Sequence, residues 1–444
     1  MQTIFGNAWV QRCCLALWLA IPLTAAASEA QVRLALAAGQ DVLLAEQPGT
    51  TYLKIQLEGL PRPEAKRRAP INVALVLDRS GSMRGEKLTH AKQAAMMALD
   101  YLRSDDSVSV VMYDHTVDIL VPATKLTDRP RLERRIRGVK AGGNTALFAG
   151  VSKGAAELRK HLDRNRVNRV ILLSDGLANV GPSTPEALQR LGQALGGETI
   201  AVSTIGLGLG YNEDLMVRLA AASDGNHVFA ERPAELAGVF RDELGGLGRV
   251  VAQRITITIE CLDGVKPIRL LGRDGQIYGK RVTARMNQIY AEQAQYLLLE
   301  VDVPPGRQGS ERPLAEVEVS YDDLLAQRTA RLTGQATVRY SGSAKEAEAS
   351  QNRDVLISAS EQQAAAMDDQ ALELKDQGDV GGAQAVFRRK AEFLREQAQK
   401  YDSNKLQSQS QRSREAEAAV AAPAPEWNKA RKTVREEQYQ IRKQ

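Results

Sequence analysis

The sequence predicts an α/β protein in which a doubly wound, mostly parallel sheet is inserted into a flanking β-sandwich and followed by a C-terminal helical appendage. Three patterns along its 444 residues predict this fold. Between residues 70 and 248, continuous apolar runs alternate with segments of helical periodicity. On both sides of that span apolar and polar residues alternate, as in half-buried antiparallel strands. After residue 342 the chain becomes rich in Ala, Glu, Gln and Lys, which favour helix.

The central span, residues 70–248, begins with the apolar strand 73–77, a Gly/Ser turn and a helix expected near residues 87–102. Continuous apolar strands are buried on both faces, as in parallel sheets. Strands alternating with helices imply right-handed crossovers and therefore a parallel sheet. Further strands are expected at residues 107–113, 116–121, 169–173, 199–205 and 227–230.

The two flanks, residues 28–69 and 249–342, are interpreted as two parts of one β-sandwich. Residues 51–57 alternate before the central span, and further alternating segments follow it at 254–260, 296–303, 314–321 and 335–340. The few strands before residue 70 cannot form a stable sandwich alone, so we expect them to pair with the later ones. Cys261 ends one of these segments and is expected to be a buried strand residue.

The C-terminal part divides into a helical hairpin at residues 343–401 and a polar tail at 402–444. The hairpin resembles a single tetratricopeptide-like unit, but one such unit buries little surface, so we expect a solvated appendage. The tail carries Ser, Gln and Arg runs and an Ala-Pro patch, and its composition predicts disorder.

The first 27 residues are interpreted as a secretory signal peptide. Arg12 precedes the apolar run 13–23, and small residues lead to a cleavage site predicted after Ala27. A membrane anchor is the alternative, but the run is shorter than the roughly 20 residues that a spanning helix needs. Cys13 and Cys14 would leave with the peptide. We therefore expect an exported protein, periplasmic, envelope-associated or secreted, with no transmembrane segment in its mature chain.

The charges argue against a nucleic-acid partner. The net charge is only +5, from 59 basic and 54 acidic side chains, and the two signs are interspersed along the chain.

Five oxygen-bearing residues follow strands or begin helices of the central span. The first strand leads into the string Asp78-Arg79-Ser80-Gly81-Ser82, Thr145 follows two glycines at a helix start, and Asp175 follows the strand 169–173. Ligands of open α/β sheets bind beyond the carboxyl ends of the strands, where the strand order reverses. We therefore expect Asp78, Ser80, Ser82, Thr145 and Asp175 to meet at that edge.

Hydroxyl and carboxylate oxygens are hard ligands that suit Mg²⁺, with Mn²⁺ or Ca²⁺ as alternatives. Magnesium usually keeps bound waters, so a coordination position can remain for a further anionic ligand. The partner expected from this chemistry is a protein that presents an Asp or Glu side chain.

Residues 71 to about 245 resemble the von Willebrand factor type A family in the order of these motifs, which also include Gly143-Asn144-Thr145 and Ser174-Asp175-Gly176. Among relatives the span is most similar to bacterial exported members and to the A domains of inter-alpha-trypsin inhibitor heavy chains and calcium-activated chloride channel regulators. The resemblance implies a metal-ion-dependent adhesion site. Ser80 and Ser82 would ligate directly, Thr145 directly or through water, and Asp78 and Asp175 largely through water. It also implies that closure moves the last helix, residues 233–244.

Other interpretations of these residues remain open. Asp78, Ser80 and Ser82 could cap a helix, although capping needs only one such residue. The string at residues 206–210 is G-x-G-x-G and not a dinucleotide motif, so we interpret it as a turn. The four histidines, His90, His115, His161 and His227, lie outside the expected metal loops, and no hydrolase motif is evident, so we expect no enzyme. An envelope scaffold, or a metal-dependent hydrolase, is the alternative function.

Overall fold

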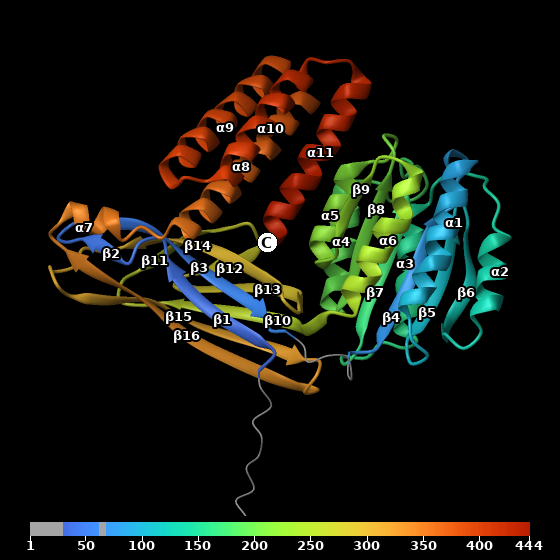
Figure 1. The fold of residues 1–444 in the computed structure, drawn as a ribbon, viewed down its shortest axis with the longest axis horizontal. Helices are drawn as coiled ribbons and strands as arrows, with labels where there is room; N and C mark the ends of the chain where they lie inside the picture. Colours follow the sequence, from blue (N-terminus) through green and yellow to red (C-terminus); the bar gives the residue numbers. More distant parts are fainter. Residues whose placement is uncertain (1–29, 62–67) are drawn as a thin grey trace, which may run out of the picture.

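The computed structural model describes residues 30–61 and 68–444 and has the predicted fold class (Figure 1). The α/β domain and the β-sandwich lie side by side, and the C-terminal helices lie above them in this view. The predicted signal peptide lies outside the described residues. Within the described part, none of the helices combines the length and the apolarity needed to cross a membrane.

The α/β domain is built on a six-stranded sheet with the order β6-β5-β4-β7-β8-β9. All pairs are parallel except β5 with β6. Every residue of β4, β7 and β8 is buried, which explains their continuous apolar sequence. The strands are β4 (Ile71–Asp78), β5 (Ser107–Tyr113), β6 (Val117–Lys125), β7 (Val167–Ser174), β8 (Ile200–Leu207) and β9 (His227–Ala230).

Helices cover both faces of this sheet. Alternate residues of β4 point to opposite faces, so Leu75 packs with α1, α2 and α6, whereas Val76 packs with α3, α4 and α5. The helices are α1 (Glu86–Ala98), α2 (Arg129–Arg137), α3 (Leu147–Arg159), α4 (Pro185–Gly197), α5 (Glu213–Ser223) and α6 (Leu236–Leu247). Short 3-10 turns are η1 (Gly81–Met83), η2 (Leu99–Tyr101) and η3 (Pro233–Glu235).

The β-sandwich takes strands from both sides of the α/β domain, so the predicted insertion is confirmed. Its smaller sheet has the order β1-β3-β14-β11, in which β3 from before the domain pairs with β14 from after it. The larger sheet has the order β12-β13-β10-β15-β16-β2. The early strands are β1 (Val32–Ala38), β2 (Val42–Leu44) and β3 (Gly49–Gly59). The later strands are β10 (Val250–Cys261), β11 (Lys266–Leu271), β12 (Gly275–Tyr278), β13 (Arg281–Tyr290), β14 (Ala294–Val303), β15 (Glu311–Asp323) and β16 (Arg328–Ser341).

The sequence did not predict β11, β12 and β13. All four residues of β12 are exposed, and β11 buries little, so apolar alternation was weak in these two strands. The first part of β13 does alternate between buried and less buried residues, so this strand was overlooked for no such reason. Cys261 is buried at the end of β10, as expected, and burial raises the pKa of its thiol to about 11.

The expectation of a disordered tail at residues 402–444 is wrong. This segment forms two helices, α10 (Asn404–Val420) and α11 (Ala424–Lys443), which follow α7 (Ala344–Ala349), α8 (Arg353–Asp376) and α9 (Val380–Tyr401). Its polar composition was misleading because the side chains of α11 find partners elsewhere in the fold. Arg431, for example, bonds Asp214 of α5 at 2.7 Å, and Trp427 is buried.

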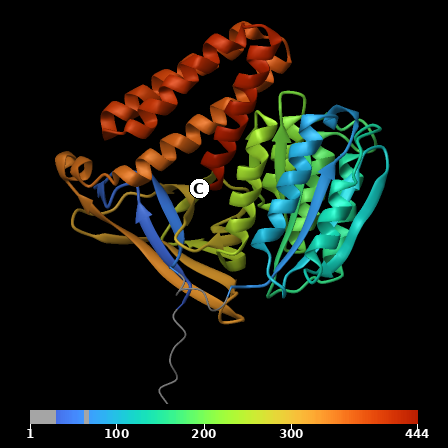
Figure 2. The same cartoon turned by 45° about the vertical axis from the view of Figure 1, so that its right-hand side comes forward.

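The helix α11 packs against β9, the last strand of the α/β sheet (Figure 1), and Figure 2 shows it between the β-sandwich and the α/β domain. Its side chains reach the backbone of that strand. Glu436 Oε1 accepts a hydrogen bond from the amide of Phe229 at 3.2 Å, and Gln440 Nε2 donates to the carbonyl of His227 at 3.4 Å. The helical appendage therefore joins the α/β domain and does not stand alone in solvent.

Candidate metal site

The carboxylate of Asp78 lies at the buried bottom of the candidate site. Asp78 ends β4, and its side chain is fully buried. Its Oδ1 accepts a hydrogen bond from the amide of Ser80 at 2.7 Å, and its Oδ2 accepts one from Ser174 Oγ at 2.8 Å. Ser174 ends the neighbouring parallel strand β7, so the carboxyl ends of two adjacent strands meet here, as expected for a doubly wound sheet.

A second carboxylate and two hydroxyls continue this cluster towards the surface. Ser80 Oγ and Ser82 Oγ lie 3.1 Å apart, and Ser82 Oγ donates to Asp175 Oδ1 at 2.6 Å. Neighbouring oxygens around an octahedral Mg²⁺ with bonds of about 2.1 Å are about 3.0 Å apart. The spacing and the chemistry of these oxygens therefore fit a small divalent cation.

Thr145 reaches the same cluster from the loop that precedes α3. The amide of Gly81 donates to the carbonyl of Gly143 at 3.0 Å, and the amide of Thr145 donates to Asn179 Oδ1 at 2.8 Å. A Cβ atom added to Gly176 would lie 3.3 Å from Ser82 Oγ and 3.4 Å from Thr145 Oγ1. The structure thus brings the five predicted residues together at one edge of the sheet.

The site is anionic. Burial raises the pKa of Asp78 to about 6, and the nearby charge of Asp175 adds to the effect. Asp175 is also buried, and its Oδ2 forms an ion pair with Lys87 Nζ. A divalent cation at this edge would offset both buried carboxylates.

The helix-capping interpretation of these residues receives no support. Ser80 precedes η1, but its side chain forms no capping hydrogen bond. The helix α1 begins after Gly85, which has no side chain that could cap it. The carboxylate of Asp78 binds the neighbouring strand end and one local amide, and does not cap a helix.

Four residues that contact or support the candidate metal site were not identified from the sequence. Lys87 lies in the first turn of the helix that follows the metal loop, a position that could have indicated it. Ser174 and Asn179 hold Asp78 and Thr145, and their roles depend on contacts between separate loops. His115 was expected to lie outside the metal loops, but its ring lies against Gly143, because a Cβ there would meet Nδ1 at 2.1 Å.

Two further loop residues, Asp114 and Glu231, contact different parts of the molecule. Asp114 borders it: its Oδ2 accepts from Arg79 Nε at 3.0 Å, and its carbonyl accepts from the amide of Ala146 at 2.7 Å. Glu231 instead pairs with Lys429 of α11 at 2.8 Å.

The glycines at residues 206–210 form the end of β8 and a turn. A side chain on Gly206 would collide with the ring of Tyr211, at 2.2 Å from its nearest atom. Gly208 has a φ of +70°, which favours glycine. Packing and turn geometry explain this string without a nucleotide.

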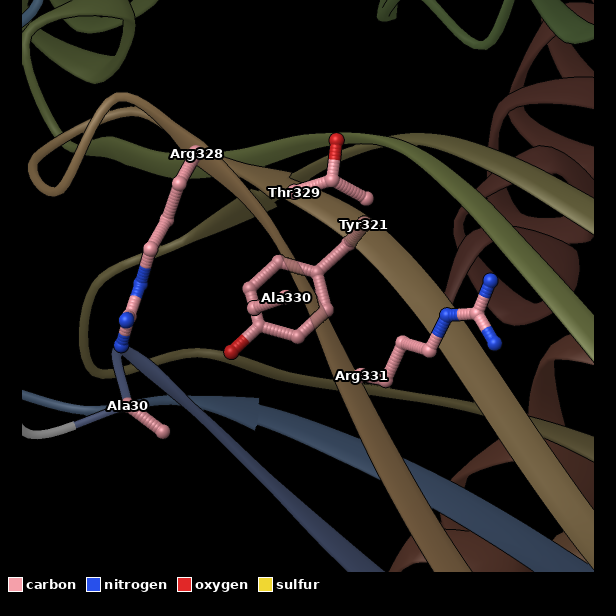
Figure 3. Close-up of a pocket in the computed structure, with 6 residues that line it drawn as sticks. All are labelled: Ala30, Tyr321, Arg328, Thr329, Ala330 and Arg331. Carbon is pink, nitrogen blue, oxygen red and sulfur yellow. The ribbon is translucent and has the colours of Figure 1, made fainter.

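A pocket on the β-sandwich is separate from this edge (Figure 3). It has a volume of about 520 Å³ and lies at the turn between β15 and β16. Figure 3 shows Tyr321 between the side chains of Arg328 and Arg331. None of the five candidate ligands lines it.

The α/β domain matches a known protein family. Residues 72–241 match the family model described as "von Willebrand factor type A domain", and the chain therefore carries a domain of this family. It is 29% identical over 276 residues to an uncharacterized protein of Synechocystis, covering 59% of this chain and 64% of that one. It is 31% identical over 180 residues to human inter-alpha-trypsin inhibitor heavy chain H3, covering 38% of this chain and 20% of that one. The matches thus span less than two thirds of these relatives.

Solved structures share the wider arrangement. A von Willebrand factor type A protein from Catenulispora acidiphila superposes with a TM-score of 0.69 at 18% identity, covering 88% of this chain and 91% of that one. VWA2 of Sulfolobus acidocaldarius, a paralog of ArnB, superposes with a TM-score of 0.63 at 17% identity, covering 91% of this chain and 98% of that one. Both alignments extend well beyond the α/β domain, so the fold of the flanking regions is shared as well.

Proposed function

We propose that this chain is an exported protein that binds a partner protein through a divalent cation. The cation is Mg²⁺, with Mn²⁺ or Ca²⁺ as alternatives, held by Asp78, Ser80, Ser82, Thr145 and Asp175. The observation that carries the proposal is the row of hydroxyl and carboxylate oxygens at spacings of 2.6 to 3.1 Å at one edge of the sheet. A Mg²⁺ ion held there usually keeps bound waters, and an Asp or Glu side chain of the partner would replace one of them.

Binding is favoured over catalysis by the chemistry of the cluster. A hydrolase needs a nucleophile or an activated water with a base positioned to take its proton. The hydroxyls of Ser82 and Ser174 instead donate to buried carboxylates, which fixes them as ligands and supports. Membership of an interaction family agrees with this conclusion.

Metal binding is tested by titrating Mg²⁺ into the purified protein in a calorimeter. Wild-type protein should bind one ion, and Ser82→Ala should bind at least about 10-fold more weakly, since it loses a ligand. Ser310→Ala, which removes a hydroxyl from a sandwich loop, should bind as the wild type does. Equal affinity in folded Ser82→Ala and wild type would overturn the assignment of the site.

Partner binding is tested by affinity capture from cell-envelope extract with and without EDTA, followed by identification of the eluted proteins. Capture should be lost with EDTA and in Asp78→Ala. If Mg²⁺ stabilises the protein but a folded Asp78→Ala variant captures the same proteins, the scaffold alternative is correct. Export is tested by fractionation, which should recover the chain from the envelope with its N-terminus at Ser28.

A further inference from the structure

Two exposed leucines lie directly beside the candidate metal site. Leu177, 59% exposed, comes two residues after Asp175. Leu209, 37% exposed, lies on the turn after β8, whose next residue, Gly210, would place a Cβ atom 3.0 Å from the carbonyl oxygen of Asp175. The loops that carry both leucines therefore meet at the residue that supplies the second carboxylate.

A pocket of about 560 Å³ begins at these leucines and ends on the C-terminal helix. Its lining includes Leu177 and Leu209 and, at the start of α11, Trp427 and Asn428. Tyr211 also lines it, with the ammonium of Lys432 placed 4.5 Å from the centre of its ring. The pocket thus connects the two exposed leucines beside the candidate metal site with the first half of α11, and its remaining lining includes charged side chains: Glu213, Asp214, Asp376, Arg431 and Lys432.

The wall contributed by α11 is fixed by ion pairs. Arg431 bonds Asp214 at 2.7 Å and Asp376 at 2.9 Å, and Lys432 bonds Glu213 at 2.6 Å. These contacts tie the start of α11 to the start of α5 and to the end of α8. The pocket is therefore formed before any partner arrives, so binding there needs little ordering of the protein.

Exposed leucines next to a preformed pocket have the character of a protein-binding surface. Apolar side chains that are left in water lower the cost of binding when a partner covers them, and such anchors carry much of the energy of protein interfaces. Their position next to the predicted cation indicates that one partner segment covers both.

We propose that the partner presents an extended segment in which an acidic residue, bound at the cation, is followed or preceded at a fixed spacing by a large apolar residue. The apolar side chain lies over Leu177 and Leu209 at the mouth of the pocket. Two residues of chain span at most about 7 Å, so the short path from Asp175 to Leu177 predicts a spacing of about two to three residues in the partner. This inference rests on the proposed function and adds that the C-terminal helix takes part in recognition.

The test uses a random peptide library displayed on phage, with one fixed central Asp and variable residues on both sides. The full chain is the bait, binding is carried out in Mg²⁺, and bound phage are eluted with EDTA. Eluted peptides should carry a large apolar residue at one position relative to the Asp. For synthetic peptides of the selected sequence, the double variant L177S/L209S should bind about 10- to 100-fold more weakly.

Two further variants test whether a loss of peptide binding is specific to this surface. Asn428→Trp places a large side chain at an exposed position of α11 on the pocket and should weaken the same peptides. Leu162→Ser is the matched control, because Leu162 is 39% exposed and lies before β7, at the opposite end of the sheet. It should leave peptide binding unchanged.

The outcomes distinguish this inference from the proposed function. Absence of peptides that elute with EDTA would overturn both. Peptides that elute with EDTA, show no apolar preference and bind L177S/L209S as tightly as the wild type would overturn the inference alone. A fixed apolar position that disappears in L177S/L209S and persists in L162S supports it.

Discussion

The two ends of the α/β sheet bury charge in opposite ways. At the carboxyl end, Asp78 and Asp175 are buried together, and the cation that faces them, Lys87, is 34% exposed. At the other end the charge is a cation: Arg169 of β7 is fully buried and donates to Ser203 Oγ at 2.8 Å and to Tyr290 Oη at 2.7 Å. One end is left anionic, and the other is neutralised by the protein itself.

This difference follows from what each end contacts. Tyr290 and Gln288, which receive the guanidinium of Arg169, belong to β13 of the sandwich, and Glu243 of α6 lies 3.5 Å from it. That end is a permanent junction between regions of one chain. The carboxyl end faces solvent and the start of α11, so a ligand can complete its charge without disturbing the junction.

The largest effect is expected from breaking the junction with Arg169→Met. Removing the guanidinium leaves Glu243 buried without its cation, which should lower the free energy of unfolding by about 3–5 kcal/mol. Urea denaturation measures this change. Arg159→Met, which removes a half-exposed partner of Glu198, should cost less than about 1 kcal/mol. A similar cost for both variants would contradict the comparison.

A change of opposite sign is expected at the carboxyl end. Asp78→Asn removes a buried charge but keeps a group that can bond Ser80 and Ser174, so it should stabilise the protein in EDTA by about 1–3 kcal/mol. The same variant should lose the stabilisation by Mg²⁺. Thermal denaturation with and without Mg²⁺ measures both effects.

The matched control for this variant is Asp106→Asn at the other end of the sheet. Asp106 is also fully buried, but Arg68 and the amide of Ile71 bind its carboxylate, at 2.9 and 2.7 Å. Replacing this carboxylate by the amide of Asn should destabilise the protein. If both variants shift the melting temperature in the same direction, the two ends do not differ as proposed.

The flank of the sheet next to α11 should respond to pH through His227. Burial, reinforced by the charge of Lys432, lowers the pKa of this histidine to about 3, whereas the unfolded chain titrates near 6.5. Between these values the unfolded chain binds a proton that the folded chain does not. The contribution of His227 to stability should therefore fall by about 1.4 kcal/mol for each unit by which the pH is lowered between about 6 and about 3.

Denaturation at several pH values checks this slope. His227→Gln should lack this contribution, so that the variant gains stability relative to the wild type as the pH is lowered, whereas His161→Gln, at an exposed position, should follow the wild type. An unchanged slope in His227→Gln would assign the pH dependence to other groups.

The smallest effect is expected from Lys87→Met. Its ammonium pairs with Asp175 and competes with a divalent cation for that carboxylate. The variant should bind Mg²⁺ about 3- to 10-fold more tightly in calorimetry, which corresponds to about 1 kcal/mol. Lys87→Arg keeps the charge and should bind as the wild type does. Weaker binding by Lys87→Met would instead indicate that Lys87 supports the site.

The sequence predicted best where one physical rule connects distant residues. Buried parallel strands end at one edge, so the meeting of Asp78 with Asp175 could be predicted from two apolar runs 96 positions apart. Contacts that follow no such rule were missed. Arg431 and Asp214 are separated by 217 positions, and nothing in the local composition of residues 402–444 indicates their pairing.

The helix α11 also has a consequence for assembly. The last strand of a sheet offers unpaired amides and carbonyls that invite another chain to add a strand, which is a route to aggregation. On β9, Glu436 and Gln440 bind the outward amide of Phe229 and the carbonyl of His227. The C-terminal helix thus covers this edge of the sheet and keeps it from pairing with another strand. A chain that has lost its last 20 residues would expose a template on which copies could stack.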